Sequence, residues 1–86
     1  MDEWKILKHP LSTEKSIRLM ESENKLLFIV DRKSTKRQIK QAVEKLFKVK
    51  VDKVNTLVRP DGSKGAYVKF SRDTPAIDIA TKLGLV

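Results

Sequence analysis

The side chains in this sequence that could do chemistry are mainly basic and polar, and one group opens an amphipathic segment. Lys36, Arg37 and Lys40 stand close together there, and Lys36 and Lys40 are one helical turn apart, so their ammonium groups can contact neighbouring phosphates. A helix N-terminus adds unpaired amides that attract phosphate. The helix dipole favours carboxylates in a first turn, so basic residues there indicate an anionic ligand. The alternative is that they form only a solvated helix face.

A second group of polar side chains lies on two extended segments joined by a tight turn. Asparagine, threonine, arginine and lysine hydrogen-bond to phosphates, ribose hydroxyls and base edges. The tyrosine in this group could stack on an unpaired base or simply cover a sheet. The candidate RNA contacts on these segments are Asn55, Thr56, Arg59, Lys64, Tyr67 and Lys69.

A third group runs through a polar loop into a helix. Its candidate RNA contacts are His9, Ser12, Thr13 and Lys15. His9 has no partner that would make it a general base. It is the only histidine and the chain has no cysteine, which excludes two-histidine and thiolate metal sites, thiol catalysis and disulfides. We therefore expect no enzyme activity, no metal, no cofactor and no small-molecule substrate.

The charge distribution indicates a polyanionic partner. The 86-residue chain carries a net charge of +8, and residues 32–72 hold thirteen basic and three acidic side chains, whereas residues 1–31 and 73–86 are each slightly acidic. A lysine-rich surface without a ligand usually contains more interspersed glutamate. An anionic membrane would require an interfacial helix that the sequence lacks. Nucleic acid is therefore the better explanation.

We expect neither a membrane span nor a signal peptide. The longest apolar run, Leu26–Val30, is far shorter than the roughly 20 residues that a bilayer requires. The N-terminus is acidic and has no long apolar stretch. The sequence thus predicts a cytoplasmic protein, and its length predicts a single domain over residues 1–86.

The N-terminal part of the chain predicts a short extended piece followed by a helix. The extended piece covers Trp4–Leu7, and Pro10 is expected to end it. Ser12 offers an N-cap for a helix over Thr13–Met20 that buries Ile17.

The middle of the chain gives the clearest local signals. Lys25–Asp31 is predicted to be a strand, and its residues Leu26–Val30 are an unbroken apolar run, so we expect it to be central and covered on both faces. Thr35 and Gln38 have the spacing of a capping box. The helix that follows, from about Lys36 to Lys48, has one apolar stripe at i, i+3, i+4, i+7 and i+8, formed by Ile39, Ala42, Val43, Leu46 and Phe47.

The C-terminal part predicts a hairpin and a last helix. Strands over Val49–Arg59 and Lys64–Ser71 are joined by a turn at Asp61-Gly62. The last helix begins at Thr74-Pro75 and packs Ile77, and Gly84 can close it. The complete order is β-α-β-α-β-β-α, which predicts an α+β domain with layered α/β/α architecture and a small, mainly antiparallel four-stranded sheet.

Four segments in this order resemble the universal ribosomal large-subunit protein twenty-three family. They are His9–Lys15, Thr35–Val49, Val54–Leu57 and Lys64–Lys69, and the likeness extends over essentially the whole chain. The resemblance implies an α/β layered domain with an antiparallel sheet, bound to large-subunit rRNA beside the polypeptide exit tunnel. It also implies contacts with neighbouring proteins, including large-subunit protein twenty-nine, and with factors that meet nascent chains, such as the signal recognition particle. Glu14 matches the glutamate that serves factor docking in bacterial relatives.

The sequence departs from the family pattern at two places. Gly65 stands where the family usually has a second basic residue, which removes one expected phosphate contact. The hairpin tip is only Pro60–Ser63, whereas bacterial members carry a long loop that reaches into the tunnel. The short tip and the compact N-terminus resemble the archaeal branch, and we do not expect this hairpin to line the tunnel.

Two other functions fit the size and charge less well. A phosphatase of the acylphosphatase type would require a glycine-rich phosphate loop, and the glycines at 62, 65 and 84 do not form one. A free RNA- or DNA-binding module of the RNA-recognition type would show paired aromatic residues on central strands. The few aromatic residues of this chain lie mostly at positions expected in a core.

Overall fold

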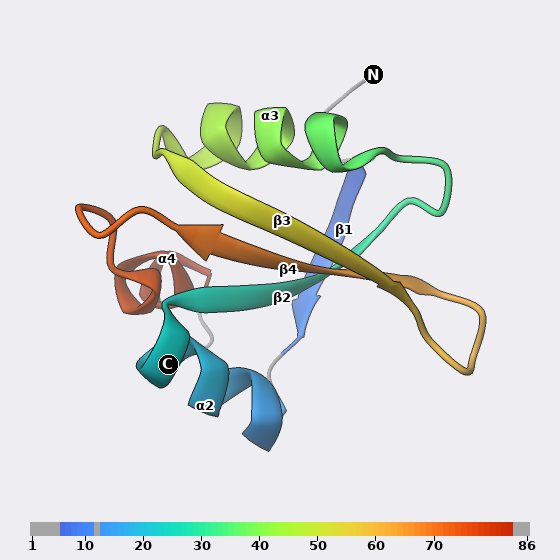
Figure 1. Ribbon diagram of the computed structural model, residues 1–86, viewed down its shortest axis with the longest axis horizontal. Coiled ribbons are helices and arrows are strands. Elements are labelled where there is room, and N and C mark those ends of the chain that lie inside the picture. Colours follow the sequence, from blue (N-terminus) through green and yellow to red (C-terminus); the bar gives the residue numbers. More distant parts are fainter. Residues whose placement is uncertain (1–5, 12, 84–86) are drawn as a thin grey trace.

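The elements follow one another in the predicted order β-α-β-α-β-β-α (Figure 1). The computed structural model describes residues 6–11 and 13–83. Four antiparallel strands form one sheet in the order β1-β2-β4-β3, so the prediction of an α+β class with a four-stranded antiparallel sheet is confirmed. The elements are β1 (Leu7–Leu11), α2 (Glu14–Glu23), β2 (Lys25–Val30), α3 (Lys36–Phe47), β3 (Val51–Val58), β4 (Lys64–Phe70) and α4 (Ala76–Lys82).

The first strand lies further along the chain than predicted. β1 covers Leu7–Leu11, whereas Trp4 and Lys5 of the predicted piece Trp4–Leu7 lie outside the described residues. Pro10 does not end the strand but is part of it, opposite Phe28 of β2. β1 pairs with β2 alone, and an edge strand tolerates a proline because its free side needs no amide donor.

Helix α2 begins with a capping box that the sequence prediction missed. Thr13 is the N-cap, and its hydroxyl accepts a hydrogen bond from the Ser16 amide at 3.1 Å, while the Ser16 hydroxyl accepts one from the Thr13 amide at 2.7 Å. The predicted cap, Ser12, lies outside the described residues. Ser16 and Met20 face the interior, whereas Ile17 is 40% exposed, so the prediction that Ile17 is buried was wrong.

Helix α3 confirms the pattern in its sequence. The Thr35 amide donates to the Gln38 side chain at 2.9 Å, and the Gln38 amide donates to the Thr35 hydroxyl at 3.2 Å. This reciprocal pair satisfies two helix-end donors. The predicted stripe faces the core: Ile39, Ala42 and Val43 are buried, and Leu46 and Phe47 pack against them.

The two faces of the sheet differ in what covers them. On one face, the sheet packs against the buried residues of α2, α3 and α4 to form the core. The sheet residues on this face are Leu26, Phe28 and Val30 of β2 and Ala66, Val68 and Phe70 of β4. Leu27 and Ile29 of β2 are also buried but do not belong to this core. All three helices therefore contribute to the core on one face, whereas an α/β/α layering would also place a helix on the other. β2 is central, as predicted.

Asn24 connects α2, β4 and α4 through hydrogen bonds of its side chain. It follows α2 in the left-handed backbone conformation, at φ 57°. Its side-chain amide donates to the carbonyls of Phe70, Ser71 and Thr74 at 2.9–3.2 Å. Its side-chain oxygen accepts a hydrogen bond from the Ala76 amide at 2.6 Å. One residue thus joins the end of α2 to the end of β4 and the start of α4.

Helix α4 buries a different isoleucine from the one expected. Ile79 packs in the core with Ala76 and Ala80, whereas Ile77 is 48% exposed. The predicted closing residue, Gly84, lies outside the described residues. No helix in the described part of the chain is long and apolar enough to span a membrane.

Candidate nucleic-acid interface

The side of the sheet that no helix of the described residues packs against, here called the open face, carries two of the predicted RNA contacts in its middle. Tyr67 on β4 lies between Leu27 on β2 and Asn55 on β3 in the strand register. Its side chain is only partly buried, as is that of Asn55. Lys69, two residues further along β4, points to the same face, so the structure brings three of the predicted site residues together.

A row of lysines crosses the open face beside Tyr67. Lys69 of β4 is the register partner of Lys25 on β2 and of Lys53 on β3. Sequence reasoning missed Lys25 and Lys53, because they are adjacent to Lys69 only through strand pairing. The alternation of each strand gives the face of each lysine, but the register that aligns them becomes visible only in the folded sheet.

The basic residues of α3 form a separate group. Lys36, Arg37 and Lys40 are exposed. Lys36 and Lys40 stand one turn apart, off the buried stripe, as predicted. Thr35 and Gln38 satisfy two of the first-turn amides, so the side chains rather than these amides are available for phosphate.

At the β3–β4 hairpin, one of the predicted RNA contacts, Lys64, instead makes a hydrogen bond within the protein. The Lys64 ammonium donates to the Ser34 carbonyl at 2.6 Å and is partly buried, so it braces the loop before α3. Thr56 points to the helix-covered face, opposite Ala66. Arg59 is partly exposed and begins the tip.

The hairpin tip is a tight turn stabilised by Asp61. The Arg59 amide donates to the Ser63 carbonyl at 2.8 Å, and Gly62 has a φ of 88°, which a glycine adopts without strain. The Ser63 hydroxyl and amide donate to the Asp61 carboxylate at 2.7 and 3.0 Å. Both bonds hold the pKa of the Asp61 carboxyl below its ordinary value, and the bond from the Ser63 hydroxyl has the larger effect. The turn is thus favoured while Asp61 is ionised and loses this support as the pH falls below that lowered pKa.

The third predicted group is dispersed. His9 is exposed on β1, opposite Ile29 and hence at the border of the open face, and Lys15 is exposed on α2. The Thr13 hydroxyl is engaged as the α2 cap. Glu14 is exposed and accepts a hydrogen bond from Arg18 at 2.7 Å, one turn further along the helix.

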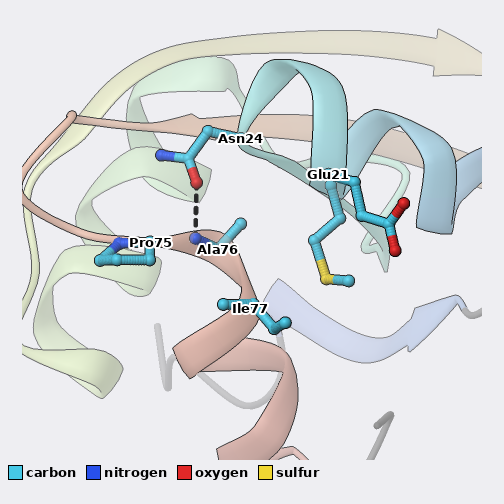
Figure 2. A pocket seen from close by; sticks show the side chains of 6 residues that line it. Glu21, Asn24, Pro75, Ala76 and Ile77 are labelled. Carbon is cyan, nitrogen blue, oxygen red and sulfur yellow. Dashed lines mark hydrogen bonds between the residues drawn. The ribbon is translucent and has the colours of Figure 1, made fainter.

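A shallow groove between α2 and α4 is mainly apolar and has an acidic residue in its lining instead of basic ones. It has a volume of about 320 Å³ and is lined by Met20, Glu21, Asn24, Pro75, Ala76 and Ile77. Figure 2 shows Glu21 on α2 and Ile77 on α4 on two sides of this space, with the hydrogen bond between Asn24 and Ala76 beside them. The sequence offered no signal for this groove, because it depends on Ile77 being left outside the core.

The described residues include no group of three or more histidine, aspartate or glutamate side chains that could hold a metal. What remains is a basic surface on α3, a mixed basic and aromatic surface on the open face, and an apolar groove with acidic neighbours. A family model described as Ribosomal protein L23 matches residues 5–80 of the chain.

Proposed function

The chain belongs to the ribosomal protein L23 family and is a structural protein of the large ribosomal subunit, and from this premise we propose that it binds large-subunit rRNA beside the polypeptide exit tunnel. The observation that carries the proposal is the basic block of residues 32–72, whose side chains at Lys36, Arg37 and Lys40 are exposed on a rigid, capped helix. Ammonium and guanidinium groups fixed in this way neutralise packed phosphates where RNA helices meet.

In this proposal, residues 1–86 form one rRNA-binding domain of a cytoplasmic ribosome, and the protein has no catalytic activity. Neighbouring proteins, including large-subunit protein twenty-nine, would contact the less basic parts of its surface. The short hairpin tip at Pro60–Ser63 supports a place in the archaeal-type branch of the family.

Binding to rRNA is expected to be strongly salt-dependent. Each phosphate contact should contribute a slope of about −0.7 to −0.9 to a plot of log affinity against log salt, because counterions are released from the RNA. The measurement is a titration of a large-subunit rRNA fragment at several salt concentrations, together with co-sedimentation of the protein with large subunits. An affinity that does not change with salt, or a failure to co-sediment, would contradict the proposal.

We further propose that the acidic end of the molecule receives exit-tunnel factors such as the signal recognition particle. Glu14, Ile17 and Glu21 are spaced i, i+3 and i+7 on α2 and lie on one side of the helix. Ile17 and Ile77 expose apolar surface in this region. A partner with basic and apolar side chains fits the side of α2 that carries Glu14, Ile17 and Glu21 better than RNA does, because these two carboxylates would repel the phosphates of RNA.

Changing Glu14 to lysine is expected to weaken association of the signal recognition particle with intact large subunits while assembly stays normal. The substitution also breaks the exposed pair with Arg18, at a cost of about 0.3–1 kcal/mol in helix stability. The matched control is Arg18→Ala, which breaks the same pair but leaves the carboxylate in place. A pull-down of the factor on variant subunits, with melting curves of the free proteins, makes the comparison. Equal losses of factor binding in both variants would show that Glu14 acts only within the helix.

A further inference from the structure

The strand register concentrates positive charge on the open face without neutralising it there. Lys25, Lys69 and Lys53 are successive cross-strand partners on β2, β4 and β3. Like charges at directly opposite positions in a sheet are destabilising. Lys25 has an ion pair with Glu23, with 3.4 Å between Nζ and the carboxylate oxygen, but the side chains of Lys53 and Lys69 make no hydrogen bond or ion pair with residues 6–11 or 13–83. The fold therefore accepts a repulsion that an anionic ligand would relieve.

The next rows of the open face are aromatic and apolar. Tyr67 lies between Leu27 and Asn55, and beyond it Gly65 lies between Ile29 and Leu57. Gly65 adds no side chain to the face, and a Cβ at that position would already be 3.4 Å from carbons of Leu27 and Leu57. Leu27, Ile29 and Gly65 are thus buried and form a packed apolar base beside Tyr67. Tyr67, Asn55 and Leu57 stay partly exposed, with cations along one side of them.

An aromatic ring beside a line of cations is the arrangement with which proteins hold single-stranded nucleic acid. Bases stack on the ring, because every base has a π-face, and the cations follow the backbone. Duplex RNA offers no free base to Tyr67 and would contact only the lysines. An acidic peptide would likewise use the lysines and leave the ring without a role.

We propose that the open face binds an unpaired nucleotide of RNA, with its base stacked on Tyr67 and its flanking phosphates contacting Lys53 and Lys69. The inference rests on the proposed binding of rRNA and adds which structure of the RNA is bound: an unpaired base held by the sheet, separate from the phosphates contacted by α3. Lys25, which Glu23 already pairs, lies at the end of the same row and extends its positive field.

Nuclear magnetic resonance of the isotope-labelled free protein tests the location. Hexa-adenylate is the probe, and an RNA duplex of similar length and hexaglutamate are the comparison ligands. We expect hexa-adenylate to shift the signals of Asn55, Tyr67 and Lys69 and to move the Tyr67 ring protons upfield, as stacking requires. Shifts confined to α3, or equal shifts of the Tyr67 ring with all three ligands, would overturn the proposal.

Four variants measure separately what the Tyr67 ring and the lysine charge contribute to the affinity for hexa-adenylate. Tyr67→Phe keeps the ring and should bind hexa-adenylate almost normally, whereas Tyr67→Leu should lose about tenfold in affinity, as for one base–aromatic stack. Lys53→Glu should also weaken binding, yet it should raise the melting temperature, because it places opposite charges at Lys53 and Lys69. Lys82→Glu makes the same charge change on α4 and should do neither. Equal affinity losses in the two glutamate variants would mean that only net charge matters.

The outcome for rRNA distinguishes this inference from the function on which it rests. If the large-subunit rRNA fragment binds with the expected salt dependence but hexa-adenylate does not shift Tyr67, the nucleotide site is wrong and the proposed function stands. If neither RNA binds, the proposed function itself fails.

Discussion

Replacing Asn24 with alanine is expected to destabilise the protein by about 3–5 kcal/mol, more than any surface substitution. The variant loses the side-chain hydrogen bonds of Asn24, in which two amide protons are shared among three carbonyls and the oxygen accepts from one amide, each full bond with a net value of roughly 0.5–1.5 kcal/mol. It also forces alanine into the left-handed conformation at φ 57°, which adds strain of the order of 1 kcal/mol. Thermal denaturation should show a melting temperature about 12–40 °C lower, since a domain of this size loses roughly 4–8 °C per kcal/mol.

Two companion variants divide this cost into its parts. Asn24→Gly removes the same hydrogen bonds but adopts the left-handed conformation freely, so it should be less destabilised than Asn24→Ala. Asn24→Asp keeps the acceptor for the Ala76 amide but turns an oxygen toward the three carbonyls, so it should be destabilised strongly. A loss below 1 kcal/mol in the alanine variant would show that α4 does not depend on this residue.

Replacing both Lys36 and Lys40 with alanine is expected to weaken rRNA binding by about 20- to 60-fold at 0.1 M salt, as the loss of two phosphate contacts requires. The salt slope should fall by about 1.4–1.8. Both side chains are exposed and off the buried stripe, so thermal stability should hardly change. Filter binding or fluorescence anisotropy with the rRNA fragment gives the affinity, and a melting curve gives the stability.

Gln38→Ala on the same helix is the matched control. It breaks the capping box with Thr35 and should cost about 1 kcal/mol of stability, with unchanged affinity for rRNA. A double lysine variant that melts at a lower temperature but binds normally would mean that the exposed and buried sides of α3 are assigned the wrong way round.

Helix α3 shows what could be predicted from the sequence. Its capping box depends on Thr35 and Gln38, three residues apart, and its stripe on the spacing from Ile39 to Phe47. Both are local signals, and both are confirmed. The alternation of Ala66, Val68 and Phe70 with Tyr67 and Lys69 is equally local and is also confirmed.

The features that could not be predicted depend on contacts between distant parts of the chain. Asn24 bonds to residues 46 to 52 positions away, so its sequence neighbourhood shows only an asparagine after a helix. Pro10 was taken as the end of a strand because nothing local reveals that β1 is an edge. Hydrophobicity alone does not fix the faces of α2 and α4: Ile17 and Ile77 lie outside the core because α2 turns Ser16 and Met20 inward and α4 turns Ala76, Ile79 and Ala80 inward.

The central position of β2 has a consequence for the order in which the chain can fold. Its pairing with β1 joins Leu11 to Leu27, which are close in sequence, but its pairing with β4 joins Lys25 to Lys69. During synthesis the β1–α2–β2 segment can therefore form early, while one side of β2 lacks a partner until β4 has emerged. Closing that long loop costs chain entropy before any distant contact forms. The bonds of Asn24 to Thr74 and Ala76 span 50 and 52 positions, so a chain that stops at the end of β4 lacks both of them.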